Sequence, residues 1–181
     1  EAVVKNLPSG VHKLSVLVDN SFSEASALHV ENDYQSYGGI SRGVMIEQLP
    51  KHYIKQLHFT PVCKDDTWYA QLELVIASLD GKPWKGKVSV SLKGCDDVNE
   101  NVLYTQSCST GAGELVLKSD LIACENAKPW APEHPTLYML SAQLEDEDGK
   151  VIDDLTDRVG FREVRTQGKD ILLNGKKLQI K

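Results

Sequence analysis

A G-x-S-x-G motif at residues 39–43 is the first pattern in this chain with a hydrolase chemistry. In α/β-hydrolases the serine of this pattern is a nucleophile on a strand-to-helix elbow. The residues after Gly43 instead read as a strand that ends at Pro50. We therefore predict that Ser41 lies in a loop and is not a nucleophile.

A second pattern, Asn99-Glu100, superficially resembles the Asn-Glu pair found in glycosidase barrels. Glycoside hydrolysis uses two carboxyl groups, about 5 Å apart in retaining enzymes. A proton donor must also be buried enough to hold its proton, and Glu100 falls in a polar turn between two expected strands. We identify no catalytic residue in this chain.

Metal-binding residue types are present without metal-binding spacing. The five histidines lack H-x-H or H-E-x-x-H spacing. Seven acidic residues crowd positions 145–157, where a calcium site is conceivable, but they lack the EF-hand pattern and read as a solvated hairpin tip. The four cysteines form no C-x-x-C pair: Cys63, Cys95, Cys108 and Cys124. The sequence does not decide whether they are free thiols or form one or two disulfides. We predict no metal and no cofactor in this chain.

The bulk properties exclude some partners. The chain has 181 residues and a net charge of -6, which argues against a nucleic-acid partner, since that would require a basic stripe. No apolar run approaches the roughly 20 residues of a membrane span. Neither property indicates a compartment.

Period-two alternation predicts the elements that must position these residues. The clearest rows of inward-facing apolar residues fall in residues 87–93, 68–77, 138–144 and 14–18. Both faces of 68–77 are apolar, so this strand is expected to be central in its sheet. Turn pairs follow or separate such rows at Asp80-Gly81, Asp148-Gly149 and Asn174-Gly175. The only helical signal is one short turn at 119–124, so the pattern predicts an antiparallel sandwich.

The last third of the chain carries three further motifs in a fixed order. Residues 128–138 read K-P-W-A-P-E-H-P-T-L-Y, residues 159–164 read V-G-F-R-E-V, and residues 172–178 read L-L-N-G-K-K-L. This series resembles the junction between the middle sandwich and the catalytic barrel of family 2 glycoside hydrolases, the β-galactosidase and β-glucuronidase group. Residues 32–42 likewise resemble the end of that family's jelly-roll sugar-binding domain, although Gly43 departs from its motif.

The resemblance implies an all-β fold in three parts. Residues 1–50 would be the closing strands of a jelly-roll sugar-binding domain. Residues 51–165 would be an immunoglobulin-like antiparallel β-sandwich, and residues 166–181 the lead-in hairpin of an absent (β/α)8 barrel. A jelly roll needs about eight strands. Residues 1–50 are therefore expected to need a cover or to be poorly ordered.

The resemblance also implies roles for five residues. Asp33 would reach the sugar subsite at the rim of the barrel, in some relatives through a bound cation; the alternative is a loop-capping aspartate. Arg42, Trp130, Phe161 and Arg162 would be structural residues between domains. Trp130 could otherwise stack on a sugar, but a plug at the end of the sandwich is the favoured interpretation. Trp68 on its strand and Trp84 in a turn receive the same structural interpretation.

The function implied is that of a scaffold. The parent enzyme would be a retaining β-glycosidase that removes terminal β-linked sugars, with β-galactosidase placed ahead of β-glucuronidase and β-mannosidase. The chain would work with the catalytic barrel of the same parent, meet carbohydrate only through it, and be inactive alone. The alternatives are a stand-alone carbohydrate-binding or adhesion module and a structural domain without a ligand.

Overall fold

The computed structural model describes residues 2–19, 21, 38–95, 100–111 and 113–178. The chain divides into two units, Glu1–Gln48 and Leu49–Lys181. Within the described ranges all regular structure is antiparallel strand, and no helix occurs, so the all-β class is confirmed. None of these residues therefore forms a helix that could cross a membrane.

The first unit contains no strand among residues 2–19, 21 and 38–48. The expected strand at 14–18 is therefore wrong. Its apolar residues Leu14, Val16 and Val18 are 72%, 58% and 45% exposed. Alternation alone does not make a strand, because the backbone groups of a strand must pair with a neighbour.

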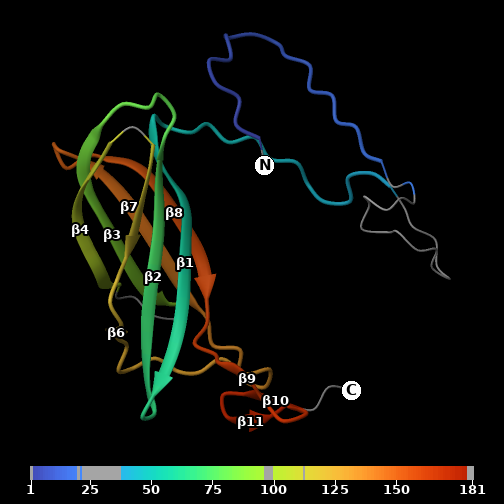
Figure 1. The fold of residues 1–181 in the computed structure, drawn as a ribbon, viewed down its shortest axis with the longest axis vertical. Helices are drawn as coiled ribbons and strands as arrows, with labels where there is room; N and C mark the ends of the chain where they lie inside the picture. Colours follow the sequence, from blue (N-terminus) through green and yellow to red (C-terminus); the bar gives the residue numbers. More distant parts are fainter. Residues whose placement is uncertain (1, 20, 22–37, 96–99, 112, 179–181) are drawn as a thin grey trace. The chain divides into compact units, whose positions relative to one another are not determined.

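The second unit is built from two main sheets and one small one (Figure 1). The first sheet has the order β1-β2-β5, with β6 also pairing with β2: β1 (His52–Lys64), β2 (Thr67–Ser78), β5 (Glu114–Lys118) and β6 (Ile122–Ala123). The second has the order β4-β3-β7-β8: β3 (Trp84–Gly94), β4 (Asn101–Thr110), β7 (Tyr138–Asp146) and β8 (Val151–Val159). The small sheet has the order β11-β10-β9: β9 (Val164–Gln167), β10 (Asp170–Leu173) and β11 (Lys176–Lys177).

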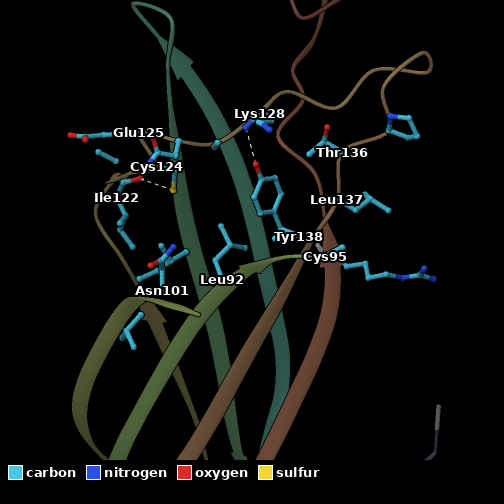
Figure 2. Close-up of a pocket in the computed structure, with 18 of the residues that line it drawn as sticks. Leu92, Cys95, Asn101, Ile122, Cys124, Glu125, Lys128, Thr136, Leu137 and Tyr138 are labelled. Atoms are coloured by element: carbon cyan, nitrogen blue, oxygen red, sulfur yellow. Dashed lines mark hydrogen bonds between the residues drawn. The ribbon is translucent and has the colours of Figure 1, made fainter. Parts of the chain in front are cut away.

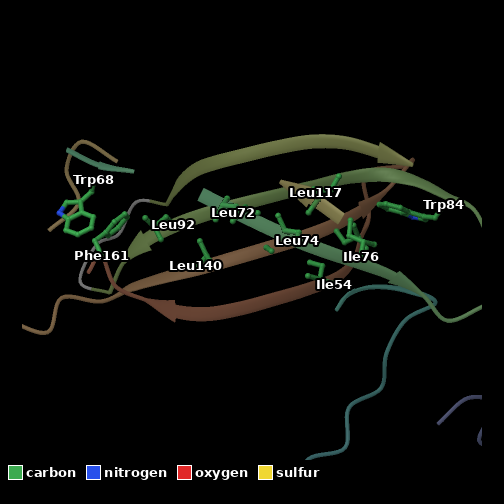
Figure 3. Packing of buried hydrophobic residues seen from close by; sticks show 14 residues of the cluster. Ile54, Trp68, Leu72, Leu74, Ile76, Trp84, Leu92, Leu117, Leu140 and Phe161 are labelled. Carbon is green, nitrogen blue, oxygen red and sulfur yellow. The ribbon is translucent and has the colours of Figure 1, made fainter. Parts of the chain in front are cut away.

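The core lies between the two main sheets (Figure 3). Alternate residues of β2, β3 and β7 point into it, as the period-two pattern predicts. Strand β2 lies between β1 and β5, which agrees with its two apolar faces. The largest fully buried side chains come from both sheets and from the segment after β8: Phe161, Leu72, Leu74, Ile76, Leu140, Leu144, Val88 and Val90.

The structure confirms one predicted turn and corrects two others. Asn174 and Gly175 have φ of 50° and 75° and join β10 to β11 as a two-residue hairpin, as predicted. The turn expected at 119–124 instead contains β6, which pairs with β2. Trp84 does not lie in a turn: it begins β3, is 9% exposed, and stacks against the ring of His52.

Candidate functional site

Phe161 is the centre of the junction that follows β8. Its side chain is fully buried, and its ring makes edge contacts with three aromatic rings from both main sheets. The centroid distances are 5.3 Å to Phe59, 5.8 Å to Trp68 and 5.2 Å to Tyr138. Phe161 therefore closes one end of the core, where Figure 3 shows it beside Trp68.

Trp130 lies directly against this junction. Its backbone N–H donates to the carbonyl oxygen of Phe161 at 2.8 Å, and Pro129 and Phe161 form a parallel β-bridge. The approach is close, because a Cβ added at Gly160 would lie 3.1 Å from Cβ of Trp130. The small residue of the G-F-R motif therefore leaves room for Trp130.

Arg162 covers one face of the Trp130 ring. The guanidinium carbon lies 5.1 Å from the ring centroid, within the range of a cation–π contact. Trp130 is half-buried and Arg162 is exposed. A sugar cannot stack on the face that the guanidinium occupies, which favours a structural role for Trp130.

The structure thus brings together three of the four residues expected between domains. The fourth, Arg42, belongs to the first unit, where its side chain is exposed. Asp33, the candidate at the substrate rim, lies outside the described residues. Asn174, which sequence reasoning treated only as a turn residue, also bonds to this junction through its side chain.

A pocket of about 1150 Å³ opens at one end of the sandwich (Figure 2). The backbone N–H of Lys128 donates to the hydroxyl of Tyr138 at 2.8 Å on its wall. Burial raises the pKa of the Cys124 thiol, an effect that a backbone hydrogen bond from Ala70 partly offsets. Cys124 therefore stays a neutral thiol at neutral pH and is not an activated nucleophile.

The remaining candidates do not form a reactive centre. Ser41 is exposed, and no helix follows it in residues 42–48. Glu100 is exposed and accepts a hydrogen bond from the hydroxyl of Ser91. All four cysteines are free thiols in the structure.

The acidic run folds into a hairpin turn. The Oδ1 atom of Asp146 accepts hydrogen bonds from the backbone N–H groups of Asp148 and Lys150 at 3.0 and 2.9 Å. Glu145 pairs with Lys87 at 2.8 Å. Among the described residues, no three histidine, cysteine or acidic side chains come together as a metal site.

The sequence profile of "Glycosyl hydrolases family 2" matches residues 52–162, which is more than half of the chain. This match covers both main sheets and ends at Arg162, the last residue of the G-F-R motif. The chain belongs to glycosyl hydrolases family 2, and the resemblance seen in the sequence is confirmed.

Similar proteins in this family differ in the sugar they act on. A crystal structure of a family 2 β-galacturonidase from Eisenbergiella tayi, bound to galacturonate, is 46% identical and superposes with a TM-score of 0.77 over 90% of this chain. A putative β-glucuronidase from Formosa agariphila is 28% identical over 99% of this chain. The β-galactosidase BgaC of Bifidobacterium adolescentis is 28% identical over 96% of it. This chain spans 28%, 21% and 16% of the lengths of these three proteins.

Proposed function

We propose that this chain is the non-catalytic β-sandwich portion of a retaining β-glycosidase that removes terminal β-linked sugars. The match of residues 52–162 to the family, together with the absence of a buried carboxylate pair among the described residues, supports a scaffolding role. In this role the sandwich orients the sugar-binding part of the enzyme against its catalytic barrel. The partner of this chain is then the barrel of the same parent protein.

Three parts of the chain would have separate roles. Residues 1–50 would complete the jelly-roll domain, residues 51–165 the immunoglobulin-like sandwich, and residues 166–181 the hairpin that leads to the barrel. The strand orders β1-β2-β5 and β4-β3-β7-β8 support the second assignment, because two facing antiparallel sheets of this size are typical of immunoglobulin-like domains. The division after Gln48 supports a boundary near residue 50.

We place β-linked hexuronic acids first among the substrates and β-galactosides second. The observation that carries this order is the 46% identity to the β-galacturonidase over 90% of the chain, against 28% identity to the β-galactosidase BgaC. This reverses the order proposed from the sequence, where β-galactosidase came first. The selective pocket of such an enzyme lies in its barrel, at the C-terminal ends of the barrel strands.

The test compares the 181-residue chain with the product of the complete gene on nitrophenyl β-galacturonide, β-glucuronide and β-galactoside. The chain alone should hydrolyse none of them, and the complete product should cleave a hexuronide with the highest kcat/KM. A higher kcat/KM on the galactoside would select the second candidate. Turnover by the purified chain alone would overturn the scaffolding role.

A stand-alone carbohydrate-binding module predicts a different result. Calorimetry of the chain with galacturonic acid, glucuronic acid and galactose should show no binding, since Arg162 occupies one face of the Trp130 ring. Binding that is lost in Trp130→Ala would favour the module over the scaffold.

A further inference from the structure

Asn174 connects the small sheet to the end of the sandwich. Figure 1 shows β9, β10 and β11 gathered at one end of the two main sheets. The Nδ2 group of Asn174 donates to the carbonyl oxygen of Trp130 at 2.9 Å, across 44 positions of sequence. Trp130 in turn donates its backbone N–H to Phe161 at 2.8 Å, so a continuous chain of hydrogen bonds runs from the hairpin to the buried core.

The same side chain also closes the base of the hairpin. Its Oδ1 atom accepts from the backbone N–H of Glu163 at 2.9 Å, and its own backbone N–H donates to the carbonyl oxygen of Glu163 at 2.9 Å. The Asn174 side chain therefore accepts a hydrogen bond from the base of the hairpin through Oδ1 and donates one to the sandwich through Nδ2. The two partners fix which end of the amide is which, because Glu163 presents a donor and Trp130 an acceptor.

Few residue types can occupy this position. Its φ of 50° lies in the left-handed region, where asparagine and glycine are favoured. Glycine lacks the side chain, and aspartate can accept from Glu163 but cannot donate to Trp130 when ionised. Asparagine alone satisfies the backbone conformation and both side-chain hydrogen bonds among these three.

We propose that Asn174 is a positioning residue that clamps the β9–β11 hairpin to Trp130 and holds hairpin and sandwich in one fixed orientation. The hairpin is then a rigid extension of the sandwich and not a flexible tether. The proposal concerns the joint within this chain and holds whichever sugar the parent enzyme cleaves.

Residual dipolar couplings measured by NMR on the 181-residue chain test this directly. In the unmodified chain, one alignment tensor should fit the amides of both sandwich and hairpin. Asn174→Gly keeps the backbone conformation but removes both side-chain hydrogen bonds. The couplings of the hairpin amides should therefore shrink and no longer fit the alignment tensor of the sandwich. Hydrogen exchange of the Trp130 amide should become faster on the order of tenfold, the effect of one lost hydrogen bond.

Two further variants sharpen the test. Asn174→Asp keeps the acceptor for Glu163 but loses the donor to Trp130, so it should release the hairpin from the sandwich even though the bond to Glu163 remains. Asp65→Gly is the matched control, because Asp65 is the first turn residue of the β1–β2 hairpin and has a φ of 47°. It should leave the β9–β11 couplings and the Trp130 exchange rate unchanged.

The proposal is overturned if one tensor still fits the whole second unit in Asn174→Gly, or if Asn174→Asp behaves like the unmodified chain. It is also overturned if core amides such as Leu74 accelerate as much as Trp130. In that case Asn174 would stabilise the fold as a whole and would not hold a local joint.

Discussion

Truncation of Phe161 to alanine should remove the most consequential side chain of the junction. The ring is fully buried, and Phe59, Trp68 and Tyr138 surround it with edge contacts from both main sheets. Replacing a buried phenylalanine with alanine costs about 3–5 kcal/mol. Each aromatic pair adds about 0.5–1.5 kcal/mol beyond the buried area. Because three rings of fixed orientation would line the cavity, we expect a loss in the upper half of that range.

Urea unfolding followed by tryptophan fluorescence measures this loss. Trp68 is a suitable probe, because its ring centroid lies 5.8 Å from that of Phe161. The midpoint of thermal unfolding should fall by roughly 10–20 °C for a unit of this size. Phe161→Leu keeps most of the volume and should lose about half as much stability.

Val164→Ala provides the surface control, because Val164 is 61% exposed only three residues further on. It should change the free energy of unfolding by less than about 0.5 kcal/mol. A loss below about 2 kcal/mol in Phe161→Ala would refute the reasoning, since it would mean that the ring is not part of the core in solution.

Three other measurements probe different parts of the sandwich. Gly86→Ala would place a methyl carbon 2.1 Å from a backbone oxygen of β7 and 2.2 Å from an indole carbon, so we expect a loss of at least about 3 kcal/mol in urea unfolding. Cys124 should react with a maleimide at pH 7 more slowly than the exposed Cys95, on the order of tenfold, because burial raises the pKa of the Cys124 thiol. Mass spectrometry measures both rates, and equal rates would contradict this. A hydrogen bond from Lys118 lowers the pKa of Glu73, so their contribution to stability should be present above the ordinary glutamate pKa of about 4.3 and lost as the pH falls below it. The difference in urea midpoint between the unmodified chain and Lys118→Met should therefore be largest at pH 7, and a difference that grows in acid would contradict it.

A control separates strain from other effects at Gly86. Gly111→Ala adds the same methyl group where no atom lies within 4 Å, at another position on the second unit. Its unfolding free energy should stay close to that of the unmodified chain. A similar loss in both variants would show that the close approach in β3 is not the cause.

Much of the sandwich could be predicted because its central strands obey a simple period. In β2, β3 and β7, every second residue is apolar, and the burial of those strands follows the same alternation. The hairpin at Asn174-Gly175 was predictable for a local reason as well, since both residues tolerate positive φ.

Strand β1 shows what a local pattern cannot reveal. It contains Pro61, and its register against β2 shifts between Ile54 and Gln56, so its apolar residues do not alternate regularly. Its turn into β2 is formed by Asp65 and Asp66, both at positive φ and without a glycine to mark it. No sequence signal identified this strand, although it runs from residue 52 to 64.

The junction was predictable in its residue types but not in its contacts. The motifs around Trp130 and Phe161 contain the residues that the structure brings together, while the bridge between Pro129 and Phe161 depends on where β7 and β8 place two distant segments. The side-chain hydrogen bond of Asn174 was missed for the same reason, because its partner Trp130 lies 44 positions earlier. A single sequence carries no record of such long-range pairs.

The two units differ in how many of their apolar side chains they bury. The sandwich buries a continuous apolar cluster from both sheets, which is the main source of folding free energy in a domain. In the described residues of the first unit, apolar side chains such as Val11, Leu17 and Ile46 are at least 90% exposed. Without burial or ladder hydrogen bonds, little offsets the conformational entropy of those residues. Among the described residues, the burial that stabilises the fold therefore lies in the second unit, as the proposed scaffolding role requires.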